Sequence, residues 1–573
     1  MRRAITSILL IALAAATLQA QQKLPPAAPL LSNSVCGKGV FIFWLGDQQI
    51  GREEFDVKCQ PDGGYAASGH TELKVPGAMI DLNTTLEVDK NAEPLTSIAK
   101  GTVNGKPFEQ SVTVKAGTAT ITTNGGSKEL PFVNGSSLVG GNIFYMNQFL
   151  LARYDAARGG VQELPIFPNI SAKTERVARD DLEATGIAAS PAPAAFDRYS
   201  ITIGLSNAIA WVDARGRIAA LAIPLQNFAA VREDYSAFVP SFKAKLAATM
   251  KEPAIDYNAP AGAPFTAEEV TVDAKGFTLA GTLLLPKTVK PAPVVIMITG
   301  SGQQTRDEFL PIPGLEKYRP FRQIAEALAS RGVAVLRVDD RGVGGSTGRD
   351  TLKTATSADF ADDVRAQAEF LRKRSDVDPA RIALVGHSEG GMIGPMVAAT
   401  DPRIAAVVLM AGPGKRGDEI IAYQVNQGLE SDPTLTDETK SQKRAEQQEA
   451  LRKAIDDSDS SASSDPLRSA WMKYFLQYDP LPTIRKVRQP ILILQGEIDR
   501  QVTADQAEII AKTAREAGNR DVTARVFPGL NHLFLPARTG ALGEYSSLST
   551  STIPDDVMKQ LTDWLVEKLA VKK

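Results

Sequence analysis

A serine in the C-terminal half of the chain lies in a pattern that suits nucleophilic catalysis. Ser388 is the centre of Gly386-His387-Ser388-Glu389-Gly390, which follows an apolar run at residues 382–385 and precedes a helix-forming stretch at 392–399. This is a G-x-S-x-G motif between a strand and a helix, the context in which a sharp turn exposes a nucleophilic serine. The glycines are needed because a side chain would collide with the neighbouring strand and helix. We therefore predict Ser388 as a nucleophile.

A histidine is the expected base, because a serine hydroxyl attacks only when its proton is removed. The chain contains three histidines. His387 is expected to point away from the hydroxyl of its neighbour, and His70 belongs to a different, β-rich part of the chain. His532 directly follows the last predicted strand, where the base of this arrangement is expected. A lone histidine is commonly structural, but elimination and placement both favour His532.

An acidic residue should orient the imidazole, and it is expected between the serine and the histidine after a late strand. The apolar run at 491–494 leads into Gln495-Gly496-Glu497-Ile498-Asp499. Asp499 occupies the loop position that can reach the imidazole, and Glu497 is the alternative. Without Ser388 and His532, either carboxylate would be interpreted as a surface group.

Two backbone N–H groups are expected to stabilise the negative oxygen that forms during attack, each by about 3 kcal/mol. One belongs to Glu389, directly after the predicted nucleophile. Its carboxylate must point away from that oxygen. The second is expected from residues 299–302, after the apolar run at 294–298. Ser301 is our first choice and Gly302 the alternative.

A sheet of parallel strands is required to bring these separated residues together. From about residue 265, apolar runs alternate with amphipathic stretches, as in strands joined by helices. Strands are expected at 294–298, 333–338, 382–385, 405–410, 491–494 and 522–527, and helices at 321–330, 357–374, 504–517 and 555–569. The pattern predicts an α/β domain over residues 265–573 with a mostly parallel sheet.

The N-terminal part has a different pattern. Between residues 21 and 237, short apolar or alternating runs are separated by turn-forming segments such as 62–64 and 124–126, which predicts an all-β domain. A Pro/Ala-rich piece at 188–195 is expected to loop out or to link two sub-parts, and similar composition at 238–264 predicts a linker. No repeat of about 40 to 50 residues is present, which argues against a propeller.

The first residues have the composition of a secretory signal peptide. Arg2 and Arg3 precede an apolar run at 8–16 and a small-residue approach that ends at Ala20. A membrane anchor is the alternative, but about a dozen apolar residues are too few for a bilayer that needs roughly 20. We expect residues 1–20 to be removed, the protein to be periplasmic or secreted, and no membrane span in the mature chain.

Charge and cysteine content limit the partners of the exported chain. Without residues 1–20 it carries 62 basic and 66 acidic groups, a net charge of −4, which argues against nucleic acid or anionic lipid as a partner. An oxidising compartment would favour a disulfide between Cys36 and Cys59, the two cysteines of the chain. The alternative is two small buried thiols. Two scattered cysteines are too few for a metal site.

Several ordered motifs together resemble bacterial carboxylesterases of the EstD type. The likeness covers about residues 267–569. It is carried by Gly300-Ser301-Gly302, Arg306-Asp307-Glu308, residues 339–346, residues 386–391, residues 496–499 and residues 529–532. Thr305 departs from the Asp expected before the arginine, which concerns local loop contacts. Residues 339–341 are expected to organise a turn beneath the site.

The resemblance implies an α/β-hydrolase domain, a Ser-Asp-His triad at Ser388, Asp499 and His532, and hydrolysis of short-acyl esters without a metal or cofactor. Residues 415–480 are polar and helix-prone and interrupt the alternation where such hydrolases commonly carry a cap. We therefore expect a lid there, with a plain surface insertion as the alternative.

We accordingly predict an exported serine carboxylesterase, a carboxylic ester hydrolase whose partner is a small-molecule ester. An exported serine peptidase or amidase of the same fold is the first alternative, because one fold serves several reactions. The second alternative is an envelope-binding protein with an inactive hydrolase domain. The complete triad argues against the second.

Overall fold

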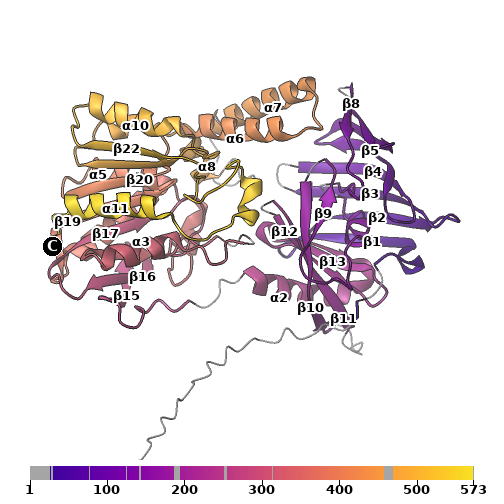
Figure 1. The fold of residues 1–573 in the computed structure, drawn as a ribbon, viewed down its shortest axis with the longest axis horizontal. Helices are drawn as coiled ribbons and strands as arrows, with labels where there is room; N and C mark the ends of the chain where they lie inside the picture. Colours follow the sequence, from indigo (N-terminus) through magenta and orange to yellow (C-terminus); the bar gives the residue numbers. More distant parts are fainter. Residues whose placement is uncertain are drawn as a thin grey trace, which may run out of the picture.

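The computed structural model contains two domains that lie side by side, each built on its own β-sheet (Figure 1). The structure describes residues 26–27, 30–75, 78–123, 126–140, 143–168, 170–185, 194–204, 206–250, 255–310, 312, 314–456 and 469–571. The predicted signal peptide at 1–20 and most of the Pro/Ala-rich piece at 188–195 lie outside these residues.

The N-terminal domain is a 14-stranded antiparallel sheet. Its strand order is β8-β7-β6-β5-β4-β3-β2-β1-β14-β13-β12-β11-β10-β9. The strands are β1 (Gly37–Leu45), β2 (Gln48–Cys59), β3 (Tyr65–Val75), β4 (Ala78–Val88), β5 (Pro94–Val103), β6 (Lys106–Lys115), β7 (Thr118–Thr123), β8 (Gly126–Pro131), β9 (Gln162–Ile166), β10 (Ile170–Leu182), β11 (Ala194–Ile203), β12 (Ser206–Val212), β13 (Ile218–Ile223) and β14 (Phe228–Arg232). The prediction of an all-β domain is confirmed.

Aromatic side chains fill the main core of this domain. Residues 143–151, which include the short helix α1 (Asn147–Leu151), pack against the sheet. The ring of Phe144 lies 4.8 Å from that of Phe43 and 5.1 Å from that of Phe228, measured between centroids. Aromatic pairs at such separations add to the free energy of burial. The connection between β8 and β9 therefore forms part of the core.

The N-terminal domain contains a disulfide between Cys36 and Cys59. The two Cα atoms are 5.8 Å apart, within the usual range for a disulfide. Cys59 ends β2, and Cys36 directly precedes β1 after the short 3-10 helix η1 (Asn33–Val35). The bond thus fixes the start of the described chain to the sheet.

The segment predicted as a linker at 238–264 contains a helix, which corrects that prediction. Helix α2 spans Val239–Met250 after the 3-10 helix η3 (Glu233–Phe238). Phe242 is buried and its ring lies 5.1 Å from that of Trp211. The Pro and Ala content suggested an extended linker, but apolar residues spaced along one helical face find a partner in the sheet.

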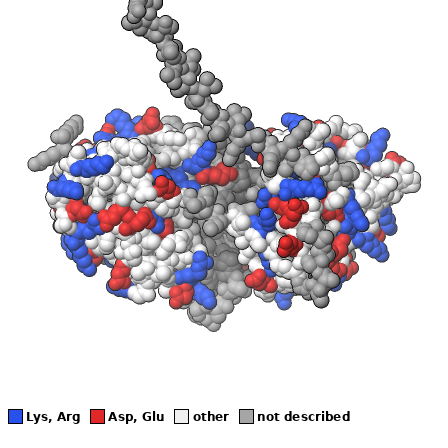
Figure 2. Space-filling view, turned by 90° about the horizontal axis from the view of Figure 1, so that it is seen from below, with Lys and Arg blue, Asp and Glu red and all other residues white. Residues whose placement is uncertain are grey.

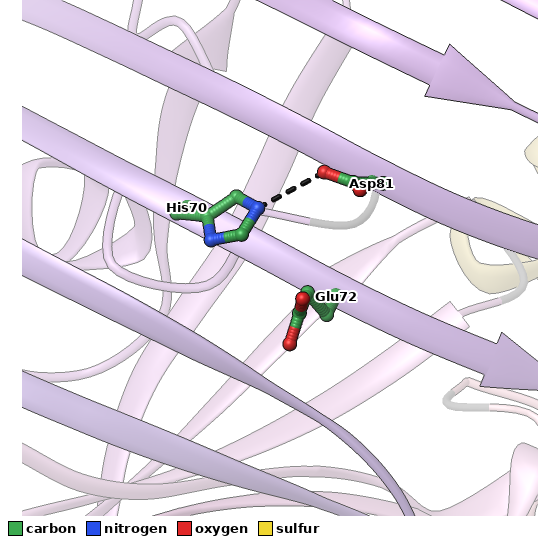
Figure 3. Close-up of side chains that lie close together, drawn as sticks. All are labelled: His70, Glu72 and Asp81. Carbon is green, nitrogen blue, oxygen red and sulfur yellow. Dashed lines mark hydrogen bonds and ion pairs between the residues drawn. The ribbon is translucent and has the colours of Figure 1, made fainter.

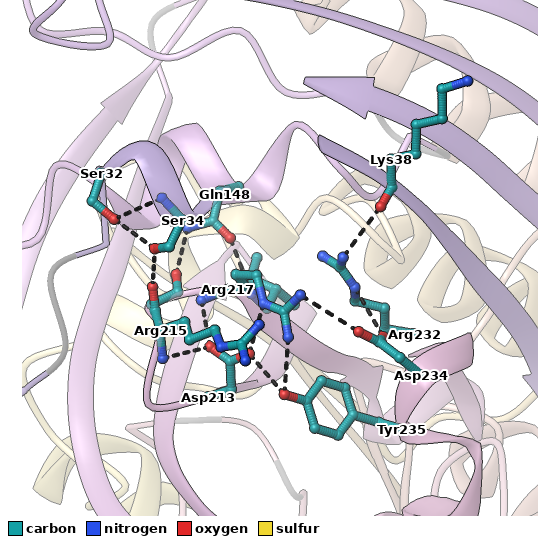
Figure 4. Close-up of polar contacts among 12 residues, drawn as sticks. Ser32, Ser34, Lys38, Gln148, Asp213, Arg215, Arg217, Arg232, Asp234 and Tyr235 are labelled. Carbon is teal, nitrogen blue, oxygen red and sulfur yellow. Dashed lines mark hydrogen bonds and ion pairs between the residues drawn. The ribbon is translucent and has the colours of Figure 1, made fainter. Parts of the chain in front are cut away.

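A polar network joins the β12–β13 turn to the segment after β14 (Figure 4). The Arg217 guanidinium donates to Asp213 at 2.8 Å, and the Tyr235 hydroxyl donates to the same carboxylate at 2.7 Å. Arg232, at the end of β14, donates to Asp234 at 2.9 Å. The buried or half-buried charges of Asp213, Arg217 and Arg232 each have an opposite charge beside them, as burial requires.

The C-terminal domain contains an eight-stranded, mostly parallel sheet of order β15-β16-β18-β17-β19-β20-β21-β22. Its strands are β15 (Phe265–Asp273), β16 (Thr278–Pro286), β17 (Ala292–Ile298), β18 (Ala334–Val338), β19 (Val377–His387), β20 (Ile404–Met410), β21 (Ile491–Gly496) and β22 (Val522–Phe527). Strand β16 pairs antiparallel with β15 and β18, and the remaining pairs are parallel. The carboxyl ends of the parallel strands therefore meet at one edge.

Helices cover both faces of this sheet. They are α3 (Pro320–Ala329), α4 (Ser357–Arg372), α5 (Gly390–Ala398), α9 (Leu481–Ile484), α10 (Asp505–Glu516) and α11 (Asp555–Lys568), with 3-10 helices η4 (Arg349–Lys353) and η6 (Leu542–Ser547). Helices α4, α5 and α10 share one apolar core, and α3 and α11 share the other. Strand β17 serves both cores, because Val294 and Ile296 face one and Val295 and Met297 the other.

The insertion predicted at 415–480 consists of α6 (Gly417–Ser431), α7 (Asp437–Asp456) and α8 (Ala470–Gln477) in the residues described. The Ser-rich break at 458–464 lies outside them. Figure 1 shows α6 and α7 reaching toward the N-terminal domain, where Lys106 of β6 donates to Glu446 of α7 at 2.6 Å. Opening and closing of this insertion as a lid stays a prediction.

The surface is mixed in charge. On the face shown in Figure 2, basic and acidic side chains are interspersed over both domains. In the described part of the chain, no helix combines the length and apolarity needed to cross a membrane.

Candidate active site

Ser388 lies at a sharp turn between β19 and α5. Its φ of +52° is in the left-handed region, which a non-glycine residue adopts only where its surroundings enforce it. The Ser388 N–H donates to the Met410 carbonyl of β20 at 2.8 Å. A Cβ at Gly386 would overlap the Gly390 carbonyl, and one at Gly390 would overlap the Ile298 carbonyl. The motif therefore contains glycine where the backbone passes closest.

His532 and Asp499 lie in contact in the buried interior of the site. The His532 Nδ1 atom is 2.7 Å from Asp499 Oδ2, and the two residues are 4% and 3% exposed. The same carboxylate accepts the N–H groups of Gln501 and Val502 at 2.7 and 3.0 Å and the Gln495 amide at 2.9 Å. Donors on both oxygens fix the orientation of the Asp499 carboxylate.

Glu497, the alternative acid, lies elsewhere. It is exposed, and its Oε2 atom accepts the Gly529 N–H at 2.9 Å. Of the two carboxylates, Asp499 is the one that contacts the imidazole.

The two loops with the predicted oxyanion donors lie beside Ser388. A Cβ on Gly300 would be 3.2 Å from the Ser388 Cβ, so the loop after β17 passes against Ser388. Among the described residues, neither the Glu389 nor the Ser301 N–H donates to a protein acceptor. Ser301 lines the same cavity as Ser388, whereas Gly302 lines a separate, smaller one. The geometry thus favours Ser301 over Gly302.

Acidic residues after β18 hold this loop. Asp340 accepts the Thr299 hydroxyl at 2.8 Å and the Gln304 N–H at 2.9 Å. Asp339 is paired with the Arg306 guanidinium at 2.9 Å. Both carboxylates are therefore engaged in shaping the turn below the site.

Ser388 and His532 share a cavity of about 320 Å³. Apolar and aromatic side chains make up most of its wall, and the insertion supplies part of it. Residues of α6 and α8 that line the cavity are Ile420, Ile421, Gln424, Trp471 and Phe475. Pockets of this size and character bind small molecules.

Comparison with known proteins agrees with the fold. Residues 312–536 match the family model described as serine aminopeptidase, S33. Esterase EstD of Thermotoga maritima is 27% identical over 311 residues, which cover 53% of this chain and 69% of that esterase. The C-terminal half of the chain has the α/β-hydrolase fold, and we call it the hydrolase domain. The resemblance to EstD-type esterases is confirmed at this level.

Two further proteins are similar to parts of this chain. Thiohydrolase apmlB of Arthrinium phaeospermum is 33% identical over 108 residues, 17% of this chain and 34% of that protein. The structure of Est1E from Butyrivibrio proteoclasticus with ferulic acid aligns with 52% of this chain and 99% of its own, at 20% identity and a TM-score of 0.35. A likeness at that score says nothing about activity.

Sequence reasoning missed the contact between the insertion and the motif of the hydrolase domain. The Trp471 indole N–H of α8 donates to Glu389 Oε1 at 2.8 Å, and the Ser357 hydroxyl donates to the same oxygen. The Glu389 carboxylate is therefore held by α8 and by the first residue of α4. The signal available in the sequence was Trp471, an aromatic residue in a polar insertion.

His387 is buried among the other residues of the site. Its ring centroid lies 5.0 Å from that of His532. Burial lowers the pKa of His387, but the Glu308 carboxylate, the His532 carbonyl and the charge of Asp499 together raise it by more, so the pKa lies above its usual value. Arg306-Asp307-Glu308 was noted as a motif, but sequence alone assigned Glu308 no partner.

His70, the third histidine, lies on the N-terminal sheet and not in the hydrolase domain. It pairs with Asp81 at 2.9 Å beside Glu72 (Figure 3). These three side chains could offer ligand atoms to a cation, but His70 is half-buried, the two carboxylates are exposed, and such acidic groups commonly occur without an ion. No second feature of the described residues points to a ligand there.

Proposed function

We propose that this protein is an exported serine carboxylesterase that hydrolyses uncharged, short-acyl esters. In this proposal Ser388 is the nucleophile, His532 the base and Asp499 the residue that orients the base. The observation that supports it most is the 2.7 Å hydrogen bond between His532 and Asp499 beside the cavity that Ser388 lines.

The proposed reaction has two steps. In the first, the Ser388 oxygen attacks the ester carbonyl carbon while His532 Nε2 takes the hydroxyl proton. The negative oxygen is stabilised by the Glu389 and Ser301 N–H groups. The alcohol then leaves with the proton from His532. In the second step, water attacks the acyl-enzyme by the same route and releases the acid. Each role belongs to a residue of this chain.

The side chains of the cavity wall and the volume of the cavity favour a substrate with an uncharged acyl group of modest size. Among the described residues that line it, none is Lys or Arg. A substrate carboxylate would lose its hydration there without gaining a partner. A volume of about 320 Å³ is at the lower end of the range for small-molecule pockets.

Export is supported by the signal-peptide pattern at residues 1–20 and by the Cys36–Cys59 disulfide. Disulfides persist in oxidising compartments. We extend the proposal to the insertion at 415–480 as a lid, supported by the side chains of α6 and α8 in the cavity wall.

A peptidase or amidase is the second candidate, because the matching family model is described as a serine aminopeptidase. When an amide is cleaved, its amine leaves only after it has been protonated. A peptide must also be held extended beside the nucleophile. The binding protein with an inactive hydrolase domain receives no support from the site, since Ser388 and His532 line one cavity and Asp499 contacts His532.

The test compares kcat/KM for an ester and an amide that carry the same acyl group, on purified mature protein. We expect the ester to be cleaved much faster, activity to decline as the acyl chain is lengthened, and a neutral acyl group to be preferred over a matched one that ends in a carboxylate. Equal or faster cleavage of the amide would replace the esterase by the peptidase.

A further inference from the structure

Two buried residues outside the proposed triad link its parts. Glu308 lies on the loop after β17 and is 4% exposed, and its φ of +57° is unusual for a non-glycine residue. Its Oε1 atom accepts the Gly300 N–H at 2.8 Å and lies 2.9 Å from His387 Nδ1. One carboxylate oxygen therefore contacts both the loop of Ser301 and the residue before Ser388.

His387 continues the connection to the proposed base. Its Nε2 atom is 3.0 Å from the backbone carbonyl oxygen of His532. A carbonyl oxygen can only accept, so Nε2 carries a hydrogen. Glu308 Oε1 already accepts from Gly300, and a hydrogen on Nδ1 gives it a second donor. Both imidazole nitrogens and Glu308 Oε1 then have hydrogen-bond partners, as buried polar groups require.

We propose that Glu308 and His387 form a positioning pair that fixes the Gly300–Ser301 loop and the His532 backbone relative to Ser388. Neither group exchanges a proton with the substrate. The chain of contacts runs from Gly300 through Glu308 and His387 to His532. Loss of the pair lets the oxyanion donor and the base shift separately, and small shifts of this kind reduce the rate strongly. This inference rests on the proposed function.

The first measurement is the rate at which a fluorophosphonate labels Ser388 in the purified mature protein. In Glu308→Ala we expect labelling and kcat for a short ester to fall by about 10²-fold, as for loss of one oxyanion donor, with KM changed by less than about threefold. Glu308→Gln keeps an acceptor for Gly300 but removes the charge. It should restore part of the rate, to about tenfold below wild type.

Asp363→Asn is the matched control. Asp363 is a buried carboxylate of the same domain, paired with Arg341 at 2.8 Å, and it does not line the cavity of Ser388. We expect a lower Tm but a labelling rate within about twofold of wild type. An equal loss of labelling in this control would show general destabilisation and overturn the proposal.

The proposal is also overturned if folded Glu308→Ala labels within about threefold of wild type. If Glu308→Ala gives no cooperative melting transition, Glu308→Gln decides: wild-type labelling in that variant overturns the pair, and a fall of about tenfold supports it. Labelling needs no ester substrate. Failure of ester hydrolysis therefore contradicts the proposed function without removing this test, with Ser388→Ala as the unlabelled baseline.

Discussion

The two domains differ in how their sheets place side chains in space. In the hydrolase domain, the loops after β17, β19, β21 and β22 lie at one edge, so residues as distant in sequence as Ser301 and His532 line one cavity. In the N-terminal domain most strands pair with their sequence neighbours, and successive turns fall on alternate edges. A parallel sheet concentrates separate motifs, whereas an antiparallel meander distributes them.

Among the substitutions that distinguish the two domains, Ser388→Ala should have the largest effect on activity. Loss of the nucleophile is expected to lower kcat/KM for a short ester by on the order of 10⁴-fold or more, because covalent catalysis is lost. The Tm of both domains should be retained. Ser330→Ala, on the exposed C-terminal end of α3, is a control that should keep full activity. Retention of most activity in Ser388→Ala would contradict the assignment.

Asp499→Asn should have the next largest effect. The imidazole would remain, but the neutral amide would hold its tautomer and orientation poorly, and we expect a fall in kcat of roughly 10³- to 10⁴-fold. Glu497→Gln is the matched control, because this exposed carboxylate contacts Gly529 and not the imidazole. Steady-state kinetics of both variants decide between them. A larger loss in Glu497→Gln would identify Glu497 as the acid.

Replacement of both Cys36 and Cys59 by serine should lower the stability of the N-terminal domain. A sequence separation of 23 residues corresponds to a stabilisation of about 3 kcal/mol from the entropy of closing the loop. We expect denaturant unfolding of the N-terminal domain to shift by this amount while ester kcat/KM is unchanged, since neither cysteine lines the cavity. Two free thiols by mass spectrometry of the unreduced exported protein would refute the bond.

The smallest effect concerns Glu53, which is buried in the N-terminal domain. Burial raises its pKa from 4.5 to about 7, although hydrogen bonds from Tyr145, Phe144 and Thr71 act in the opposite direction. The folded protein therefore binds the proton more tightly than the unfolded chain. Proton binding by Glu53 therefore contributes to the free energy of unfolding at pH 4.5. This contribution falls by roughly 2.5 kcal/mol as the pH rises from 4.5 to 7.

Unfolding free energies of the N-terminal domain across this pH range test the prediction for Glu53. Glu53→Gln cannot ionise and should lose the slope between pH 4.5 and 7 while the hydrolase domain behaves as in wild type. The same slope in wild type and variant, or a wild-type stability that rises with pH, would assign the dependence to another group.

Sequence pattern predicted much of the hydrolase domain because its signals are local. A buried strand, a G-x-S-x-G turn and a following helix are adjacent in the chain, so Ser388 could be placed between a strand and a helix. The boundaries were less accurate, because β19 extends well beyond the predicted strand at 382–385. The alternation of β and α elements likewise predicted the mostly parallel sheet. Composition was less informative at 238–264, where the Pro and Ala content hid helix α2.

Tertiary structure decided which side chains meet. Sequence order left Asp499 and Glu497 as alternatives, and the direction of each side chain in the loop after β21 distinguished them. Sequence order also left Glu308 without a role. The contacts of Glu308 with Gly300 and His387 arise where β17 and β19 lie side by side. By itself the sequence determined residue types, local turns and the succession of strands and helices along the chain. Contacts between loops depend on strand order within the sheet and on close packing, which only the folded chain specifies.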